Sequence, residues 1–394
     1  MSNWKTVKLS ELGTIVGGAT PATSRDEYYN GDIPWLTPKD LAEYSARYIS
    51  RGERNITKAG LKSCSAKMLP KGTVLFSSRA PIGYVAIAKN DICTNQGFKS
   101  VIPNANVSSL FLYYLLKYNK EKIEAVGSGT TFKEVSGSTM RNVEVYVPIE
   151  LRTQNKIAHI LNSIDSKIEN NNLINDNLLR QALCIYASLI DGKPKNGCIS
   201  DYCTLKSGFA FKSKWWQDSG VPVAKIGSIN QDCLNLTNCS YVSEDKISLA
   251  KDFVVSGGDL LIAMTGATIG KFTMVPKTTE TILVNQRVGK FFLGDNPVSR
   301  IPFIYSTLKQ PEVISEIINR GQGSAQPNIS ASDIMSIPCV IPKSAEINAF
   351  NEQTTPMFEL IINNQYENTM LANTRDSLLP YLMSGKMDIS NVDF

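Results

Sequence analysis

The sequence predicts a mixed α/β fold in which two similar globular units are separated by an antiparallel pair of long coiled-coil helices, related by a pseudo-twofold axis. Three observations predict this class. At 394 residues the chain is too long for one ordinary core, its second half repeats the first at a nearly constant offset, and each half ends in a long stretch typical of a helix. We expect four segments, at 1–150, 151–195, 196–343 and 344–394.

The repeat consists of short motifs that recur in the same order in both halves. They are GDIPWLTPKDL at 31–41 with SGVPVAKIGSI at 219–229, KGTVLFSSRAPIGYVA at 71–86 with GGDLLIAMTGATIGKFT at 257–273, Asn95-Gln96 with Asn285-Gln286, FLYYLL at 111–116 with FIYSTL at 303–308, and GSGTTFKEVS at 127–136 with GQGSAQPNIS at 321–330. An apolar run beside Pro or an Ile-Gly pair is typical of a strand that ends in a turn. Each unit is therefore expected to hold the same strands, loops and helix.

The two long helices carry matching seams of residues spaced 4-3-4-3-4, the pattern of a coiled coil. The first seam lies in a helix expected over about 152–191 and consists of Ile164, Ile168, Asn171, Asn175, Leu178 and Ala182. The second seam is shifted by 193 residues and consists of Met357, Ile361, Asn364, Asn368, Leu371 and Arg375. A seam asparagine costs stability but fixes register, because its amide must find a polar partner. Antiparallel pairing places Asn171 near Asn368 and Asn175 near Asn364, which makes these four the candidate register residues. Two unrelated amphipathic surface helices are the alternative.

The expected helix length suggests what the pair is for. A helix over these residues extends about 60 Å, which is nearly two turns of DNA at about 34 Å per turn. Two such helices would hold the globular units at a fixed separation and in twofold-related orientations, as recognition of two separated DNA half-sites requires. A spacer without a role in nucleic-acid binding is the alternative.

Charge is divided unevenly along the chain. The net charge of +5 comes from 41 basic and 36 acidic residues; residues 1–195 carry +8, of which +6 lies in 1–150, and residues 196–394 carry −3. The amino-terminal segment lacks the apolar run of a signal peptide, and no apolar stretch has the length of a membrane span. We therefore expect a cytoplasmic protein without a membrane segment.

The motifs of common enzymes are absent. The eight cysteines include no CxxC pair and the chain has one histidine, so we expect buried thiols and no metal site. GATIGK at 266–271 is one residue too short for a phosphate loop and is followed by Phe272 in place of Ser or Thr. There is no Gly-x-Ser-x-Gly motif, and the chain lacks the Pro-Pro pair that an amino-methyltransferase loop needs. We expect no catalytic residues, and by elimination a recognition or assembly protein.

Two stretches carry a family resemblance. TRDSLLPYLMSGKMDIS at 374–390, with GDIPWLTPKDL and FSSRAPIG at 76–83, closely resembles the specificity subunit of Type I restriction-modification systems, and the likeness covers essentially the whole chain. It implies target recognition domains at 1–150 and 196–343, a central helix at 151–195 that serves as spacer and methyltransferase docking site, and a C-terminal helix and tail at 344–394 that pair with it.

The resemblance also implies partners. The chain would recognise an asymmetric bipartite sequence in double-stranded DNA and direct two adenine methyltransferase subunits and the restriction-translocase subunits to it. In that family S-adenosylmethionine, ATP and magnesium belong to the partner subunits, so we expect this chain to bind no cofactor.

Polar residues on the repeated loops are the candidate DNA contacts, because Arg or Lys pairs with guanine and Asn or Gln with adenine in the major groove. They are Lys39, Ser78, Arg79, Tyr84, Asn95, Gln96 and Lys133 in the first half, and Lys225, Thr265, Thr268, Lys271, Asn285, Gln286 and Arg287 in the second. The Asn-Gln pairs recur in both halves, so a structural role remains open for them. Unshared positions such as Arg79 against Thr265 are better candidates for specificity.

Two other functions remain open at this point. One is a stand-alone nuclease or transferase with dispersed active-site residues, and the other is a coiled-coil scaffold that binds no DNA.

Overall fold

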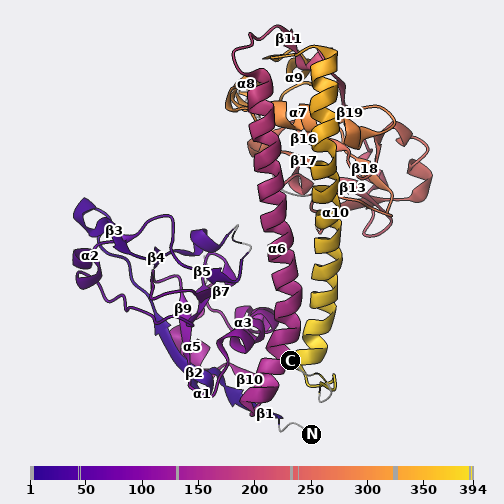
Figure 1. The fold of residues 1–394 in the computed structure, drawn as a ribbon. Helices are drawn as coiled ribbons and strands as arrows, with labels where there is room; N and C mark the ends of the chain where they lie inside the picture. The colour runs from indigo at the N-terminus through magenta and orange to yellow at the C-terminus, as the bar shows by residue number, and fades with distance from the viewer. Residues whose placement is uncertain are drawn as a thin grey trace. The chain divides into compact units, whose positions relative to one another are not determined.

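The chain forms two compact units that share both long helices. The computed structural model describes residues 4–394 apart from 43, 45, 130–132, 231–233, 238, 323–326, 390, 391, 393 and 394. The first unit comprises Met1–Glu169 with Leu371–Phe394, and the second comprises Asn170–Met370. Helices α6 (Leu151–Ile190) and α10 (Ser344–Met383) therefore contribute to both units (Figure 1).

This division differs from the four expected segments, although β10 and α6 meet close to the expected boundary at 150. The reason is packing, since the ends of the helices complete the globular cores. Ile157 and Leu161 of α6 are buried in the main core of the first unit, and Phe358 and Ile361 of α10 are buried in the main core of the second.

The first unit is built on a five-stranded sheet of order β2–β9–β6–β7–β5, in which only the β5–β7 pair is parallel. Its strands are β1 (Trp4–Lys8), β2 (Gly13–Gly17), β3 (Tyr29–Ile33), β4 (Trp35–Leu36), β5 (Tyr48–Ile49), β6 (Val74–Ser78), β7 (Ile82–Ala88), β8 (Cys93–Thr94), β9 (Lys99–Pro103) and β10 (Glu144–Pro148). Its shorter helices are α1 (Leu9–Leu12), α2 (Lys58–Lys62), α3 (Ser109–Tyr118), α4 (Lys120–Ala125) and α5 (Gly137–Asn142). Helix α3 is almost entirely apolar, because it is buried between the sheet and α6.

The second unit contains two four-stranded sheets, of order β12–β19–β16–β17 and β14–β13–β18–β15. Its strands are β11 (Gly197–Cys198), β12 (Thr204–Ser207), β13 (Val221–Ala224), β14 (Ser240–Val242), β15 (Val254–Val255), β16 (Leu260–Ala263), β17 (Phe272–Met274), β18 (Ile282–Val284), β19 (Val288–Phe292) and β20 (Pro338–Cys339). Its shorter helices are α7 (Ile301–Leu308), α8 (Pro311–Gly321) and α9 (Ala331–Met335).

The two units have the same internal topology. The antiparallel series β2–β9–β6–β7 corresponds to β12–β19–β16–β17, and the short parallel pair β4–β8 corresponds to the parallel pair β13–β18. The outer pair β1–β10 corresponds to β11–β20, and both units place a buried helix, α3 or α7, after the last strand of the sheet. The duplication predicted from sequence is therefore a duplication of fold.

The long helices pack antiparallel. In the second unit Asn171 Nδ2 donates to Asn368 Oδ1 at 2.9 Å, and Asn364 Nδ2 donates to Asn175 Oδ1 at 2.8 Å. Residue numbers thus rise along α6 while their partners fall along α10. Helix α10 continues through Pro356. Among the described residues, no helix is long and apolar enough to cross a membrane.

Candidate nucleic-acid interface

Backbone hydrogen bonds bring four loop segments of the first unit together. At the end of β6, the Ser78 N–H donates to the Gly97 carbonyl at 2.7 Å, and the Ser78 carbonyl accepts from the Val135 N–H at 3.0 Å. The Asn95 N–H donates to the Leu36 carbonyl at 2.8 Å. These bonds join the end of β6, the β8–β9 loop, the end of β4 and the segment before α5.

The second unit repeats this arrangement bond for bond. The Met264 N–H donates to the Arg287 carbonyl at 3.0 Å, and the Met264 carbonyl accepts from the Ile329 N–H at 3.0 Å. The Asn285 N–H donates to the Ala224 carbonyl at 3.0 Å. The hydrogen bonds therefore align the two sets of loops independently of side-chain identity.

This alignment pairs Arg79 with Thr265 and Ala80 with Gly266. Ala80 and Gly266 both have positive φ, at 52° and 72°, a conformation that glycine adopts more readily than alanine. The β6–β7 and β16–β17 turns thus share a backbone conformation while differing in sequence.

The paired asparagines shape the β8–β9 and β18–β19 loops. Asn95 Oδ1 accepts from the Gly97 N–H at 2.8 Å, and Asn285 Oδ1 accepts from the Arg287 N–H at 3.3 Å. A side chain that bonds the backbone two residues ahead stabilises a turn. The structural alternative is thus favoured for both asparagines. Neighbouring Gln96 and Gln286 are exposed, and Gln96 accepts a hydrogen bond from Thr20.

Two of the predicted contacts are buried. Ser78 is fully buried, and its Oγ donates to the Gly97 carbonyl at 3.1 Å. Thr265 is 9% exposed, and its Oγ1 has no hydrogen-bond partner among the residues that the structure describes. This burial argues against a DNA contact by Ser78, because the last residue of β6 directs its side chain into the unit. Thr268 Oγ1 donates to the Thr265 carbonyl at 3.2 Å and is half-buried.

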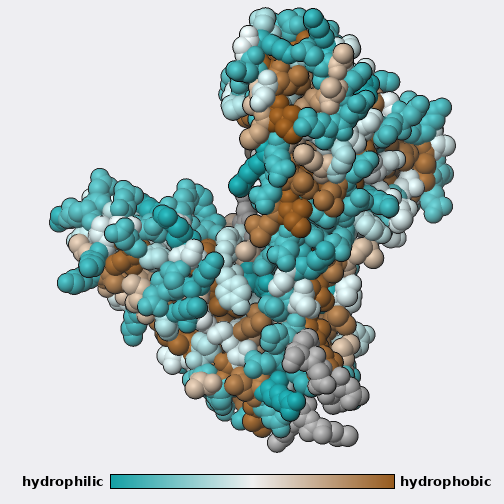
Figure 2. All heavy atoms as spheres, viewed as in Figure 1, coloured by the Kyte–Doolittle hydropathy of each residue, from teal (hydrophilic) through white to brown (hydrophobic). Residues whose placement is uncertain are grey.

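Other candidates lie on the surface. Lys133, Lys271 and Arg287 are exposed, and so is Lys39, which forms an ion pair of 3.0 Å with Glu53. Tyr84, on β7, is half-buried. The visible surface around β3 and α2 is mostly hydrophilic (Figure 2). Parts of the repeated glycine-rich motifs, 130–132 and 323–326, lie outside the described residues.

The first unit also contains an ion cluster that sequence reasoning missed. Glu134 lies 3.5 Å from Arg79 and 3.2 Å from Lys99, measured between carboxylate oxygens and the nearest charged nitrogens. The aligned positions of the second unit hold Asn328, Thr265 and Gly289 in place of these three. The sequence did show that the two halves differ at these aligned positions. Only the folded structure shows that the three residues, which come from separate loops, form one ion cluster.

Lys225 points inward. Its Nζ donates to Ser240 Oγ at 2.6 Å and lies 3.8 Å from the centroid of the Trp216 ring. Burial lowers the pKa of Lys225. Lys212 and Lys246 lie over the ring of the adjacent Trp215, at 5.4 and 5.0 Å from its centroid. This part of the second unit is therefore a basic and aromatic cluster.

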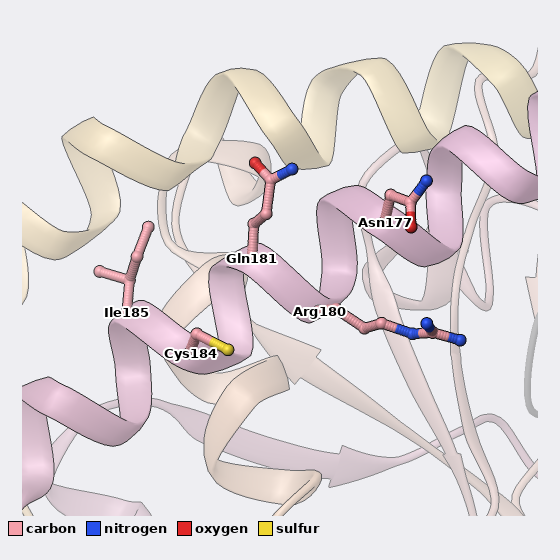
Figure 3. Close-up of a pocket in the computed structure, with 5 residues that line it drawn as sticks. All are labelled: Asn177, Arg180, Gln181, Cys184 and Ile185. Carbon is pink, nitrogen blue, oxygen red and sulfur yellow. The ribbon is translucent and has the colours of Figure 1, made fainter.

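A shallow groove of about 530 Å³ lies along one face of α6 in the second unit. Figure 3 shows the side chains that line it, Asn177, Arg180, Gln181, Cys184 and Ile185. It contains no acid–base pair. In the described part of the chain, no cluster of His, Cys, Asp and Glu could hold a metal ion.

The expectation of buried cysteines is only partly right. Cys93, Cys203 and Cys339 are buried, whereas Cys184 is exposed because it lies on the face of α6 that borders the groove. Cys64, Cys198 and Cys239 are half-buried. Cys233 lies outside the described residues.

Comparison with known proteins gives consistent matches. A family model described as the Type I restriction modification DNA specificity domain matches residues 1–180 and 193–356. The chain is 34% identical to the Type I restriction enzyme MjaIX specificity subunit of Methanocaldococcus jannaschii, over 99% of this chain and 95% of the relative. It is 30% identical to the HindI specificity subunit of Haemophilus influenzae over 46% of this chain and 41% of the relative. The crystal structure of the Type I S subunit from M. genitalium has a similar fold, with a TM-score of 0.54 and 19% identity, over 99% of this chain and 97% of that one.

Proposed function

The chain belongs to the specificity subunits of Type I restriction-modification systems, and on this premise we propose that its two units recognise different halves of one interrupted, asymmetric DNA sequence. It is a DNA sequence-recognition subunit and not an enzyme. The proposal concerns how recognition is divided between the units and which residues perform it.

The observation that carries the proposal is the shared loop framework with unshared side chains. Both units join their loops by the same three backbone hydrogen bonds, yet one framework presents Arg79, Lys99 and Glu134 where the other presents Thr265, Gly289 and Asn328. Phosphate contacts position a protein on DNA, whereas side chains at base edges determine sequence. Two equal frameworks with different side chains therefore suit two different half-sites.

Arg79 is the base-contacting residue that we propose for the first unit. Its guanidinium is partly exposed, and Glu134 restrains it from an adjoining loop. An arginine fork matches the O6 and N7 acceptors of guanine in the major groove, so the first half-site should include a guanine. In the second unit the exposed residues of the aligned loops, Lys271, Gln286 and Arg287, take this role.

Membership of the family implies assembly with methyltransferase and restriction subunits and with DNA. We further propose that two adenine methyltransferase subunits dock along the long helices, and that they and the restriction-translocase subunits supply the cofactors. Exposed apolar side chains support this docking, because Leu173 and the adjacent Ile174 of α6 are 60% and 43% exposed. Exposed apolar groups favour a protein contact when they form a contiguous patch.

The test is to co-express the chain with its methyltransferase subunit and map methylated adenines by sequencing. Arg79→Ala should relax one guanine position in one half of the motif, with a loss of about 10- to 100-fold in preference, because a bidentate pair contributes about 1–3 kcal/mol. The matched control is Arg51→Ala, an exposed arginine outside the loops, which should leave the motif intact. An unchanged motif in Arg79→Ala would remove this residue from the proposal.

A further inference from the structure

A buried ion pair lies where α6 meets α10 in the first unit. Asp165 is 6% exposed, and its carboxylate accepts from the Tyr114 hydroxyl at 2.6 Å and from Arg375 Nη1 at 2.8 Å. Arg375 Nε also donates to Asp376 at 2.8 Å. The helix pair is therefore closed here by opposite charges, one from each helix.

The second unit closes the corresponding position without charge. The repeat shift of 193 residues carries Asp165 to Phe358 and Ala182 to Arg375. Phe358 and Ala182 are completely buried in one apolar cluster, and the Phe358 ring lies 5.5 Å from the ring of Tyr305. One helix crossing is thus ionic and its counterpart is apolar.

The other seam positions do not distinguish α10 from α6 by charge. Apart from Arg375, the seam positions are apolar or asparagine in both helices at the same spacing, so α6 matches the α6 of a second copy almost as well as it matches α10. In such a like-with-like pair Asn171 would meet Asn175 of the other copy, and Ile168 would meet Leu178. Asp165, however, would meet Ala182 and lose its guanidinium partner.

We propose that the Asp165–Arg375 pair makes α6 select α10 of its own chain over the α6 of a second copy. A buried carboxylate without its ion-pair partner is strongly destabilising, and a charge that rejects the wrong partner is an established means of specificity. The asparagines set the register of the helices, whereas the ion pair determines which helices pair. This inference does not depend on DNA recognition.

The experiment uses the full chain. Asp165→Phe with Arg375→Ala makes the first crossing a copy of the second and removes the distinction. Sedimentation velocity should then show a dimer fraction at least tenfold above that of the unmodified chain at equal concentration. The control is Lys193→Ala with Glu346→Ala, which removes a 2.6 Å ion pair outside the seam and should leave the sedimentation unchanged.

A crosslink identifies how a dimer is paired. Ile168→Cys with Leu178→Cys, in a Cys184→Ser background, places both new thiols on α6, so a disulfide between positions 168 and 178 of two copies requires like-with-like pairing. We expect this crosslink only when Asp165 and Arg375 are also replaced. A dimer without it would reflect exchange of helices between copies and would overturn the proposal, as would an unchanged sedimentation profile or the same crosslink with Asp165 and Arg375 present.

Should circular dichroism show that the Phe and Ala replacements unfold the chain, Asp165→Asn with Arg375→Gln takes their place. That variant keeps the side-chain shape at position 165, shortens the polar side chain at position 375 and removes both charges. The same dimer and the same crosslink are expected, and their absence in the folded variant contradicts the inference.

Discussion

Two neighbouring residues at the end of β6 have opposite roles in this protein. Ser78 is fully buried and donates to the backbone of the adjoining loop, whereas Arg79 is partly exposed beside Glu134. Successive side chains at the end of a strand point to opposite faces, which is why two adjacent polar residues with similar motif positions differ so much. Polarity alone did not separate them.

Replacement of Ser78 tests this assignment. Ser78→Ala should lower the free energy of unfolding by about 1 kcal/mol, the usual value of one lost hydrogen bond, and should leave the methylated DNA motif unchanged. Urea denaturation measures the first effect and adenine mapping the second. Ser65→Ala, at an exposed serine, should stay within about 0.5 kcal/mol of the parent. A changed motif in Ser78→Ala would return this residue to the DNA interface.

The cysteines should differ in reactivity. Burial raises the pKa of Cys203 and Cys339 to about 12 and that of Cys93 to about 11. A raised pKa leaves little thiolate at pH 8, and the thiolate is the nucleophile. Iodoacetamide at pH 8 should therefore modify exposed Cys184 first and the three buried thiols only after unfolding, as read by peptide mass spectrometry. Early modification of Cys203 would contradict the described core.

At the scale of elements, the long helices combine apolar packing with a polar centre. Asn171 is buried and donates to both Glu367 and Asn368, yet its own Oδ1 has no partner within the described chain. A partly satisfied amide in a seam costs stability. Such a residue specifies the register, because a shifted alignment of the two helices would leave its amide with fewer hydrogen bonds and would be less stable still.

Replacing one asparagine pair tests whether the asparagines lower stability and specify register. Asn171→Leu with Asn368→Leu should raise Tm by a few degrees, since about 1 kcal/mol corresponds to about 2–4 °C for a protein of this class. The gain should be accompanied by a less defined register, detected as slower-forming disulfides between cysteines placed at Ile168 and Leu371. A lower Tm with undiminished crosslinking would mean that the asparagines stabilise the pair and do not select its register.

At the scale of the whole molecule, the two duplicated halves carry different net charges. Residues 1–150 carry a net charge of +6, whereas residues 196–343 carry +2, with local basic residues such as Lys206, Lys212 and Lys214, and residues 344–394 carry −5. Neutralised phosphates release counterions, so DNA affinity falls with salt in proportion to the phosphates contacted. The first unit should therefore provide more of the sequence-independent grip on DNA.

Paired charge neutralisation tests this division. In the complex with methyltransferase, Gln at Lys58, Lys62 and Lys67 should reduce the slope of log affinity against log salt more than Gln at Lys206, Lys212 and Lys214. A gel-shift titration over about 50–200 mM salt measures both slopes. Equal reductions would contradict the division of labour, and a complex with no salt dependence would favour a scaffold that does not contact DNA.

Much of this architecture could be predicted because it is written in local patterns. The repeated turns, the helix expected over about 152–191 and the seam with its four asparagines follow from residue spacing along the chain, because spacing determines which residues share a face of a strand or helix. The family motif at the carboxyl end is likewise contiguous. Even the alignment of Arg79 with Thr265 was visible in the sequence.

Contacts between distant residues were decided only by the tertiary structure. The cluster of Arg79, Lys99 and Glu134 joins three loops, and the pair of Asp165 with Arg375 joins residues that are 210 positions apart. Burial of Ser78 and exposure of Cys184 likewise depend on which neighbours fold over them. A periodic pattern states which residues share a face, but the partner of that face, and therefore each side chain's charge environment and exposure, arises only when the chain packs.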